Sequence, residues 1–231
     1  MNKQLPIGGM VPFSATDYPE KLSAVIFCQG CPWRCRYCHN PHLQPISQKN
    51  TMQWEEVLSF LKTRQNLLEA VVFSGGEPIL HPELPPVIQE VKQLGFKVGL
   101  HTSGAYPSQL KKILPFVDWV GMDIKAPFEK YESITLRKKS GKTAEECARY
   151  IIESNVAYEF RTTVHSDLLS QADLEQIAHA LQKIGAKHYA LQNFKPGGCE
   201  DAKLCQNHLD SHFSLKAMQK ICSAFATFAV R

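Results

Sequence analysis

The sequence predicts an α/β fold built on a parallel sheet, and three observations point to it. Short β-branched or aromatic runs alternate six times with amphipathic stretches along the 231 residues. Gly and Pro residues separate the two kinds of segment. The candidate motifs follow directly after apolar runs, where function collects in parallel sheets. Six such units are too few to close a barrel of eight strands.

The first half of the chain yields four expected strands and three expected helices. Residues 1–23 are rich in Gly, Pro and Ser, so we expect them to be irregular. A helix over 51–65 has Thr51 as its N-cap candidate and Glu55 in its first turn. In the next helix the pair Pro85–Pro86 suits the first turn, where missing amides cost least. The strands are expected at 23–27, 70–74, 97–101 and 117–124, and the helices at 51–65, within 82–94 and at 108–114.

The second half continues the alternation. A helix over 143–154 is expected to be capped by Thr143, with Glu146 three residues on. Gly185 is expected to end a helix over 171–184. Strands are expected at 158–164 and 188–192, and a last helix at 215–228. The basic run 137–142 is expected to be a solvated loop, or else to meet an acidic partner.

Composition sets limits on the class of protein. The chain is 44% hydrophobic and 21% charged, which is ordinary for a globular protein. Its net charge of +4 is too small to indicate nucleic-acid binding. It has neither an 18-residue apolar run nor an apolar leader, so we expect no membrane contact and a cytoplasmic location. We expect a single domain over 1–231, with a core at about 23–196 and a tail and helix at 197–231.

Four cysteines lie within eleven residues, at Cys28, Cys31, Cys35 and Cys38. A disulfide framework is disfavoured, because the chain is long enough to bury a core and lacks a secretory signal. A structural zinc site would use all four thiolates, but zinc pairs are normally separated by a dozen residues and here by three. The third interpretation takes Cys31, Cys35 and Cys38 alone. Three ligands on a four-iron cluster leave one iron open, and an open position is typical of a catalytic metal.

The triplet C-x3-C-x2-C, with Tyr37 before its last cysteine, resembles the signature of the radical S-adenosylmethionine superfamily. The surrounding QGCPWRCRYCHNP resembles the loop of glycyl-radical-enzyme activases, the group that contains the pyruvate formate-lyase activating enzyme. The upstream segment 17–25 resembles anaerobic ribonucleoside-triphosphate reductase activating proteins. The resemblance extends to about Pro196.

This resemblance implies an open, partial (β/α)6 barrel that holds a 4Fe–4S cluster on Cys31, Cys35 and Cys38 and binds S-adenosylmethionine. It implies an activase that installs a glycyl radical on a partner enzyme, here an anaerobic (class III) ribonucleotide reductase. An electron donor such as flavodoxin or ferredoxin would supply the electron. Other activase partners, a small-molecule radical enzyme and a zinc-stabilised binding module remain open.

The resemblance also implies a set of cofactor-binding residues at the strand ends. Two glycines after a strand let a ligand approach the backbone, and a carboxylate beside them suits an ammonium group. A D-x-K motif places its two charged side chains on the same side of a strand. His101 stands where an acidic or other polar residue is usual, which puts a cation site there in doubt. The implied residues are Tyr37, His39, Gly75, Gly76, Glu77, Thr102, Asp123, Lys125, Thr163 and Lys195, with Asp17 as a further candidate.

The remaining cysteines are expected to be mostly structural. Cys28, Cys147 and Cys222 are interpreted as packing residues. Cys199 and Cys205 lie in a Gly-rich segment. We expect them to be loop thiols or else to form a second metal site.

Overall fold

The computed structural model describes residues 5–46, 52–207, 223 and 225–231. In these residues one sheet holds eight strands in chain order, from β1 to β8. β1 is antiparallel to β2, and every other neighbouring pair is parallel. The expected α/β fold with an unclosed parallel sheet is confirmed. The strands are β1 (Ile7–Ser14), β2 (Ser23–Cys28), β3 (Ala70–Gly75), β4 (Lys97–Thr102), β5 (Trp119–Asp123), β6 (Ala157–Val164), β7 (His188–Asn193) and β8 (Thr227–Val230).

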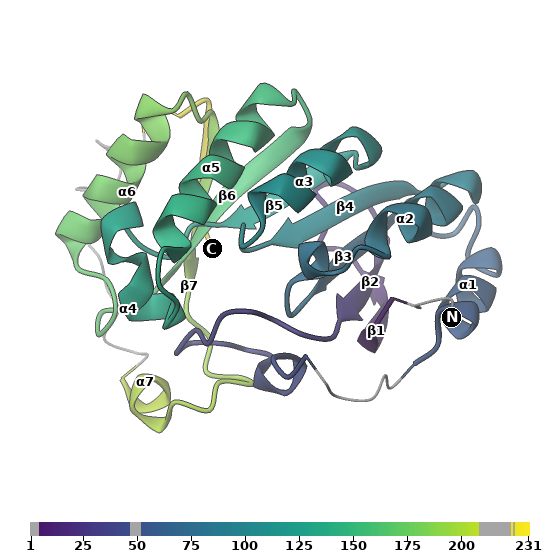
Figure 1. Ribbon diagram of the computed structural model, residues 1–231, viewed down its shortest axis with the longest axis horizontal. Helices are drawn as coiled ribbons and strands as arrows, with labels where there is room; N and C mark the ends of the chain where they lie inside the picture. The colour runs from purple at the N-terminus through teal and green to yellow at the C-terminus, as the bar shows by residue number, and fades with distance from the viewer. Residues whose placement is uncertain (1–4, 47–51, 208–222, 224) are drawn as a thin grey trace.

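The longer helices connect the parallel strands and lie side by side along one face of the curved sheet (Figure 1). Gly185, with φ of +88°, follows the end of α6, as expected for a helix stop. Ser170 starts α6, and its hydroxyl and the Asp173 carboxylate form a reciprocal capping box. The helices are α1 (Trp54–Lys62), α2 (Leu84–Gln93), α3 (Pro107–Ile113), α4 (Tyr131–Thr135), α5 (Ser140–Glu153), α6 (Gln171–Lys183) and α7 (Ala202–Gln206).

Both edges of the sheet differ from expectation. β1 lies in a segment expected to be irregular, because the glycines and Pro12 conceal an edge strand, where Pro is tolerated. The expected last helix is wrong at its end, since Thr227 and Phe228 belong to β8. The rest of that helix falls mostly on 208–222, outside the described residues.

Several helix boundaries also differ. α5 begins at Ser140, so Thr143 lies inside the helix, where its hydroxyl donates to the Ser140 carbonyl. The end of the basic run is therefore helical rather than loop. Thr51 lies outside the described residues, and Gln53 stands at the N-cap of α1. The short helices α4 and α7 were not expected, because five residues carry too little periodicity to be recognised.

Apolar side chains cover both faces of the sheet. The larger cluster lies between the strands and the helices and includes Ile26, Val71, Phe73 and Val120. The neighbours of these residues point to the opposite, concave face, because side chains alternate along a strand. There Tyr18, Val25, Ala70, Val72 and Trp119 form a second, smaller cluster. Apolar packing thus occupies both faces of the central strands, and the carboxyl ends of these strands are left to form a site. No helix among the described residues is both long and apolar enough to cross a lipid bilayer.

Candidate active site

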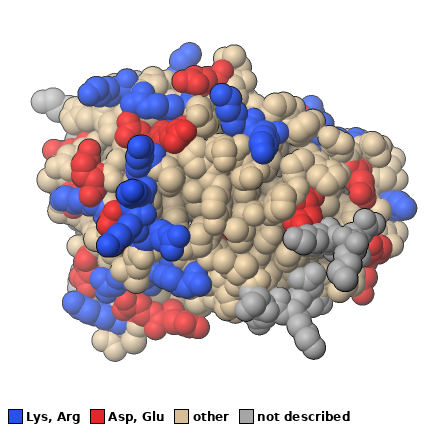
Figure 2. All heavy atoms as spheres, viewed as in Figure 1, with Lys and Arg blue, Asp and Glu red and all other residues tan. Residues whose placement is uncertain are grey.

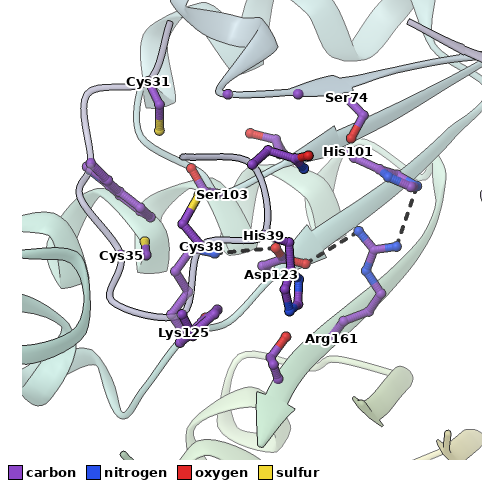
Figure 3. A pocket seen from close by; sticks show the side chains of 17 residues that line it. Cys31, Cys35, Cys38, His39, Ser74, His101, Ser103, Asp123, Lys125 and Arg161 are labelled. Carbon is purple, nitrogen blue, oxygen red and sulfur yellow. Dashed lines mark hydrogen bonds and ion pairs between the residues drawn. The ribbon is translucent and has the colours of Figure 1, made fainter. Parts of the chain in front are cut away.

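An open cavity lies at the carboxyl ends of the parallel strands (Figure 3). Its walls come from the loop after β2 and from the ends of β3, β4, β5 and β6. Seventeen residues line it: Cys31, Trp33, Cys35, Tyr37, Cys38, His39, Asn40, Ser74, Gly75, Gly76, His101, Thr102, Ser103, Asp123, Lys125, Arg161 and Thr163. Segments distant in sequence meet here because parallel strands end at the same edge of the sheet.

One wall of the cavity consists of three thiols, on Cys31, Cys35 and Cys38, carried by a loop over residues 29–40 that we call the cysteine loop. Figure 3 shows the three sulfur atoms on one side of the cavity, across from Arg161. The fourth cysteine, Cys28, is the last residue of β2 and is fully buried in the hydrophobic cluster. The structure therefore separates this cysteine from the other three and confirms it as a packing residue.

The two glycines after β3 bring this strand end into contact with the cysteine loop. Gly75 has φ of +117°, and a Cβ there would lie 2.4 Å from the Cys28 backbone nitrogen. A Cβ on Gly76 would lie 2.2 Å from the Gly30 carbonyl oxygen. Both positions therefore require Gly, and their bare backbone lines the cavity.

Glu77 is fully buried, and it is absent from the described residues that line the cavity. One carboxylate oxygen accepts a 2.7 Å hydrogen bond from the Thr102 hydroxyl. The other accepts a 2.8 Å hydrogen bond from the Ser103 backbone N–H and a short hydrogen bond from the Ser103 hydroxyl. Burial raises the pKa of Glu77, although these hydrogen bonds oppose the rise. Its carboxylate thus joins the ends of β3 and β4.

The D-x-K motif at the end of β5 contributes a buried charge pair. The Lys125 ammonium lies 3.3 Å from an Asp123 carboxylate oxygen and 5.4 Å from the centre of the Tyr37 ring. Burial alone would lower the pKa of Lys125, but Tyr37 and Asp123 hold it well above its usual value. The Tyr131 hydroxyl accepts from the Lys125 backbone N–H at 2.9 Å and donates to the Asp123 carbonyl at 3.3 Å. Lys125 is therefore a fixed cation in the cavity wall.

A second charged group lies on the side away from the thiols. Arg161 on β6 approaches Asp123 at 3.4 Å, and its Nε is buried with no hydrogen-bond partner. The Nε2 atom of His101 lies 2.9 Å from the Asp17 carbonyl oxygen, so we assign its proton there. Burial and the charge of Arg161 lower the pKa of His101 to about 3, so this ring is neutral at physiological pH.

The tail after β7 folds back onto the cysteine loop. His39 Nε2 lies 2.8 Å from the Lys195 carbonyl oxygen, and its ring stacks on Phe194 at 5.6 Å between centroids. The Arg36 guanidinium binds one Asp201 carboxylate oxygen through two nitrogens, at 2.9 and 3.2 Å. We call residues 194–206 the clasp, because they hold the outer side of this loop.

Most of the expected site residues meet in the cavity. Three of them do not line it: Glu77, which is enclosed behind its wall, Lys195, which contributes a backbone carbonyl to His39, and Asp17. Asp17 lies beside His101, with a carboxylate oxygen 4.0 Å from Nδ1. The eleven that line the cavity are Cys31, Cys35, Cys38, Tyr37, His39, Gly75, Gly76, Thr102, Asp123, Lys125 and Thr163.

The cavity wall also holds six residues outside the expected set: Trp33, Asn40, Ser74, His101, Ser103 and Arg161. From the sequence, His101 is only a doubtful cation ligand. For Arg161 the sequence carries a usable signal, because it precedes Thr163 by two positions and the two side chains share a face of β6. Ser103 carried none, because its role depends on where Glu77 comes to lie.

The chain belongs to the Radical SAM superfamily, whose sequence pattern it matches over residues 25–184. A Methanocaldococcus jannaschii protein, named provisionally as a glycyl-radical enzyme activating enzyme, is 30% identical over 226 residues, covering 95% of this chain and 92% of that protein. The pyruvate formate-lyase-activating enzyme of Clostridium pasteurianum is 33% identical over 126 residues, covering 52% and 53% of the two chains. The fold is similar to that of Streptococcus suis SuiB bound to S-adenosylmethionine, at a TM-score of 0.64 and 11% identity, over 88% of this chain and 48% of that one.

Radical SAM enzymes use a 4Fe–4S cluster and S-adenosylmethionine, and the cavity suits both. Soft thiolates are the ligands that iron–sulfur clusters take. Cys28 is fully buried in the hydrophobic cluster, so a zinc site that uses all four cysteines is not favoured. A glycine backbone and a fixed cation beside the thiols suit an amino-acid ligand with a carboxylate.

Proposed function

We propose that this protein is a glycyl-radical-enzyme activase and that its partner is an anaerobic ribonucleotide reductase. The observation that carries the first part is a three-thiol cavity in a chain that is 30% identical, over 95% of its length, to a protein named as such an activase. The choice of an anaerobic ribonucleotide reductase as the partner rests on the resemblance of residues 17–25 to activating proteins of that enzyme.

In this proposal Cys31, Cys35 and Cys38 hold the 4Fe–4S cluster and leave one iron to S-adenosylmethionine. When bound, this pair of cofactors supplies a 5′-deoxyadenosyl radical by one-electron cleavage of the sulfonium. The electron would come from a flavodoxin or a ferredoxin in the cytoplasm.

The residues of the chain then bind and orient S-adenosylmethionine and shield the site from water. The Lys125 ammonium attracts the carboxylate of S-adenosylmethionine, and Asp123 keeps that ammonium in place. Gly75 and Gly76 let the ligand reach backbone groups, and Thr102 and Thr163 add hydroxyls to the wall. Trp33 and Tyr37, both buried, exclude water from the cysteine loop. The glycine of the partner must enter the open cavity to give up its hydrogen atom.

The test is electron paramagnetic resonance of a partner enzyme after anaerobic incubation with reconstituted protein, S-adenosylmethionine and a reductant. We expect a glycine-centred doublet on an anaerobic ribonucleotide reductase and none on a variant in which its radical glycine is replaced by Ala. A doublet on pyruvate formate-lyase alone would reject the proposed partner but keep the activase. Absence of 5′-deoxyadenosine under all conditions would reject the activase itself.

A further inference from the structure

A group of exposed basic side chains lies beside the cysteine loop, outside the cavity. Arg137, Lys138 and Lys139 follow the end of α4, and Arg34 belongs to the loop itself. All four are exposed, and none lines the cavity. Figure 2 shows Lys and Arg side chains gathered on the side of the molecule where α4 and α5 lie. We call these four residues the basic collar.

Backbone hydrogen bonds fix the collar next to the thiols. The Arg34 backbone N–H donates to the Thr135 carbonyl at 2.9 Å, and that of Arg36 donates to the Ile134 carbonyl at 3.4 Å. These bonds join the stretch around Cys35 to the last turn of α4, from which the collar continues. Arg34 is therefore the residue next to Cys35, and Arg137, Lys138 and Lys139 start two residues after Thr135, which accepts the Arg34 hydrogen bond.

The charges of the collar are not neutralised within the molecule. In the described part of the chain, none of the four side chains forms an ion pair with a carboxylate. The Arg34 guanidinium donates to the carbonyls of Cys31 and Trp33, at 2.7 and 2.9 Å. The nearby Glu132 carboxylate accepts from the Lys139 backbone N–H, not from its ammonium. The collar thus presents positive charge to solvent.

An apolar residue lies among these charges. Leu136 is 62% exposed and adopts a left-handed conformation, with φ of +53°. A bulky residue seldom adopts this conformation, and a large exposed apolar side chain ringed by cations is a usual feature of a small interaction surface. Electron-transfer complexes have interfaces of this small, charged kind.

We propose that the basic collar and Leu136 form the docking surface for an acidic one-electron carrier protein, of which a reduced flavodoxin is the probe. This rests on the proposed function, since the collar adjoins the loop assigned to the cluster. One electron leaves the reduced flavin and enters the cluster, and no bond is made or broken. A carrier has only to approach the cysteine loop from outside, whereas the glycine of the partner must enter the cavity.

The experiment compares two reductants on the intact, reconstituted protein. The triple variant Arg137→Glu, Lys138→Glu, Lys139→Glu should form 5′-deoxyadenosine at least about tenfold more slowly with limiting reduced flavodoxin, because steering of this size depends on charge. With illuminated 5-deazariboflavin, a small uncharged reductant, its rate should match that of the wild type. The matched control changes Lys62, Lys112 and Lys183 to Glu. These exposed lysines lie in the last turns of α1, α3 and α6, opposite the carboxyl ends of the strands.

Two further measurements keep the idea testable if the triple variant folds poorly. In the wild type, only the flavodoxin-driven rate should fall as salt rises from about 0.05 to 0.3 M, because the attraction is screened. Leu136→Asn, which introduces a residue tolerant of the left-handed conformation, should raise the dissociation constant of the complex with flavodoxin, measured by calorimetric titration. A flat salt profile, or an equal loss in the control variant, would overturn the collar as the docking surface. Failure of the wild type with both reductants would instead reject the activase.

Discussion

At the scale of single residues, the structure assigns different roles to neighbouring cysteines. Cys28 ends a strand and is packed in the hydrophobic cluster, whereas the other three line the cavity. Burial raises the pKa of Cys28, Cys31 and Cys35, with the charge of Glu77 adding to the first two. The thiols of the two cluster ligands, Cys31 and Cys35, stay protonated until a metal displaces their protons. Cluster loading should therefore become more favourable as the pH rises.

The cysteine roles lead to a first prediction. Replacing Cys31, Cys35 or Cys38 by Ala should abolish the brown colour of the reconstituted protein, because each of these thiolates is expected to hold the iron–sulfur cluster. Cys28→Ala should keep the colour and cost about 1 kcal/mol of unfolding free energy, because it only removes a packed sulfur. Iron and sulfide analysis with a denaturation curve checks both. Loss of colour in all four variants would instead show that Cys28 is also needed to hold the cluster.

His101 leads to a prediction about pH. Its pKa is about 3 in the folded protein, mainly through burial and then Arg161, against about 6.5 in an unfolded chain. The unfolded state therefore binds more protons in between, and stability falls as the pH drops below about 6.5. Chemical denaturation from pH 7 to 5 should show a loss of up to about 1.4 kcal/mol per pH unit that His101→Gln lacks. Equal slopes in the two proteins would contradict a buried neutral ring.

Residue types and spacing were enough to predict much of this site. Clustered cysteines, paired glycines and a D-x-K motif each indicate chemistry through their own composition. The direction of the Glu77 carboxylate could not be predicted, because it depends on donors from β4 that only the fold brings close. The same holds for Arg161, whose ion-pair partner Asp123 lies on the neighbouring strand β5.

At the scale of secondary-structure elements, the close contact between the end of β3 and the cysteine loop is a tight packing constraint. Gly76→Ala should place a methyl group against the Gly30 carbonyl and lower the unfolding free energy by about 1–3 kcal/mol, as overpacking does. Gly9→Ala on β1 is the matched control, because no atom lies within 4 Å of the added Cβ. Thermal denaturation of both variants checks this prediction. Equal midpoints would show that the cysteine loop moves aside for the added methyl group at no cost in stability.

The clasp yields a prediction about the cysteine loop. Asp201→Ala removes a partly exposed ion pair and the side-chain N-cap of α7, so the unfolding free energy should fall by about 1–2 kcal/mol. The same change frees the Arg36 end of the loop, so a chelator should bleach the cluster several-fold faster. Lys203→Ala is the control, since its 3.9 Å contact with Asp167 does not touch the loop. Identical bleaching rates in the two variants would mean that the clasp does not hold the loop.

The elements were predictable where the apolar periodicity is long. The six central strands and the helices between them follow from alternating patterns, with boundary shifts of a few residues. The two edge strands were not, because an edge strand pairs on one side only and carries little hydrophobic pattern. β1 is interrupted by Gly and Pro, and β8 has four residues.

At the scale of the whole molecule, the site links many strands and therefore the whole fold. The cavity takes residues from the ends of β3 to β6 and from the cysteine loop. A group bound there stabilises only the native state, so the reconstituted protein should unfold at a higher temperature than the metal-free protein, by about 2–4 °C for each kcal/mol of binding linkage. Anaerobic calorimetry checks this, with metal-treated Cys35→Ala as control. An equal rise in that variant would place the binding elsewhere.

β1 and β8 each have a single neighbour in the sheet order. A ring of strands resists deformation, because changing its diameter strains every ladder at once. An arc can bend by small changes of twist spread over its seven pairs, with each pair keeping its register. The opening of the cavity can thus change its width at little cost in energy. Bound segments of different thickness can then reach the same three sulfur atoms.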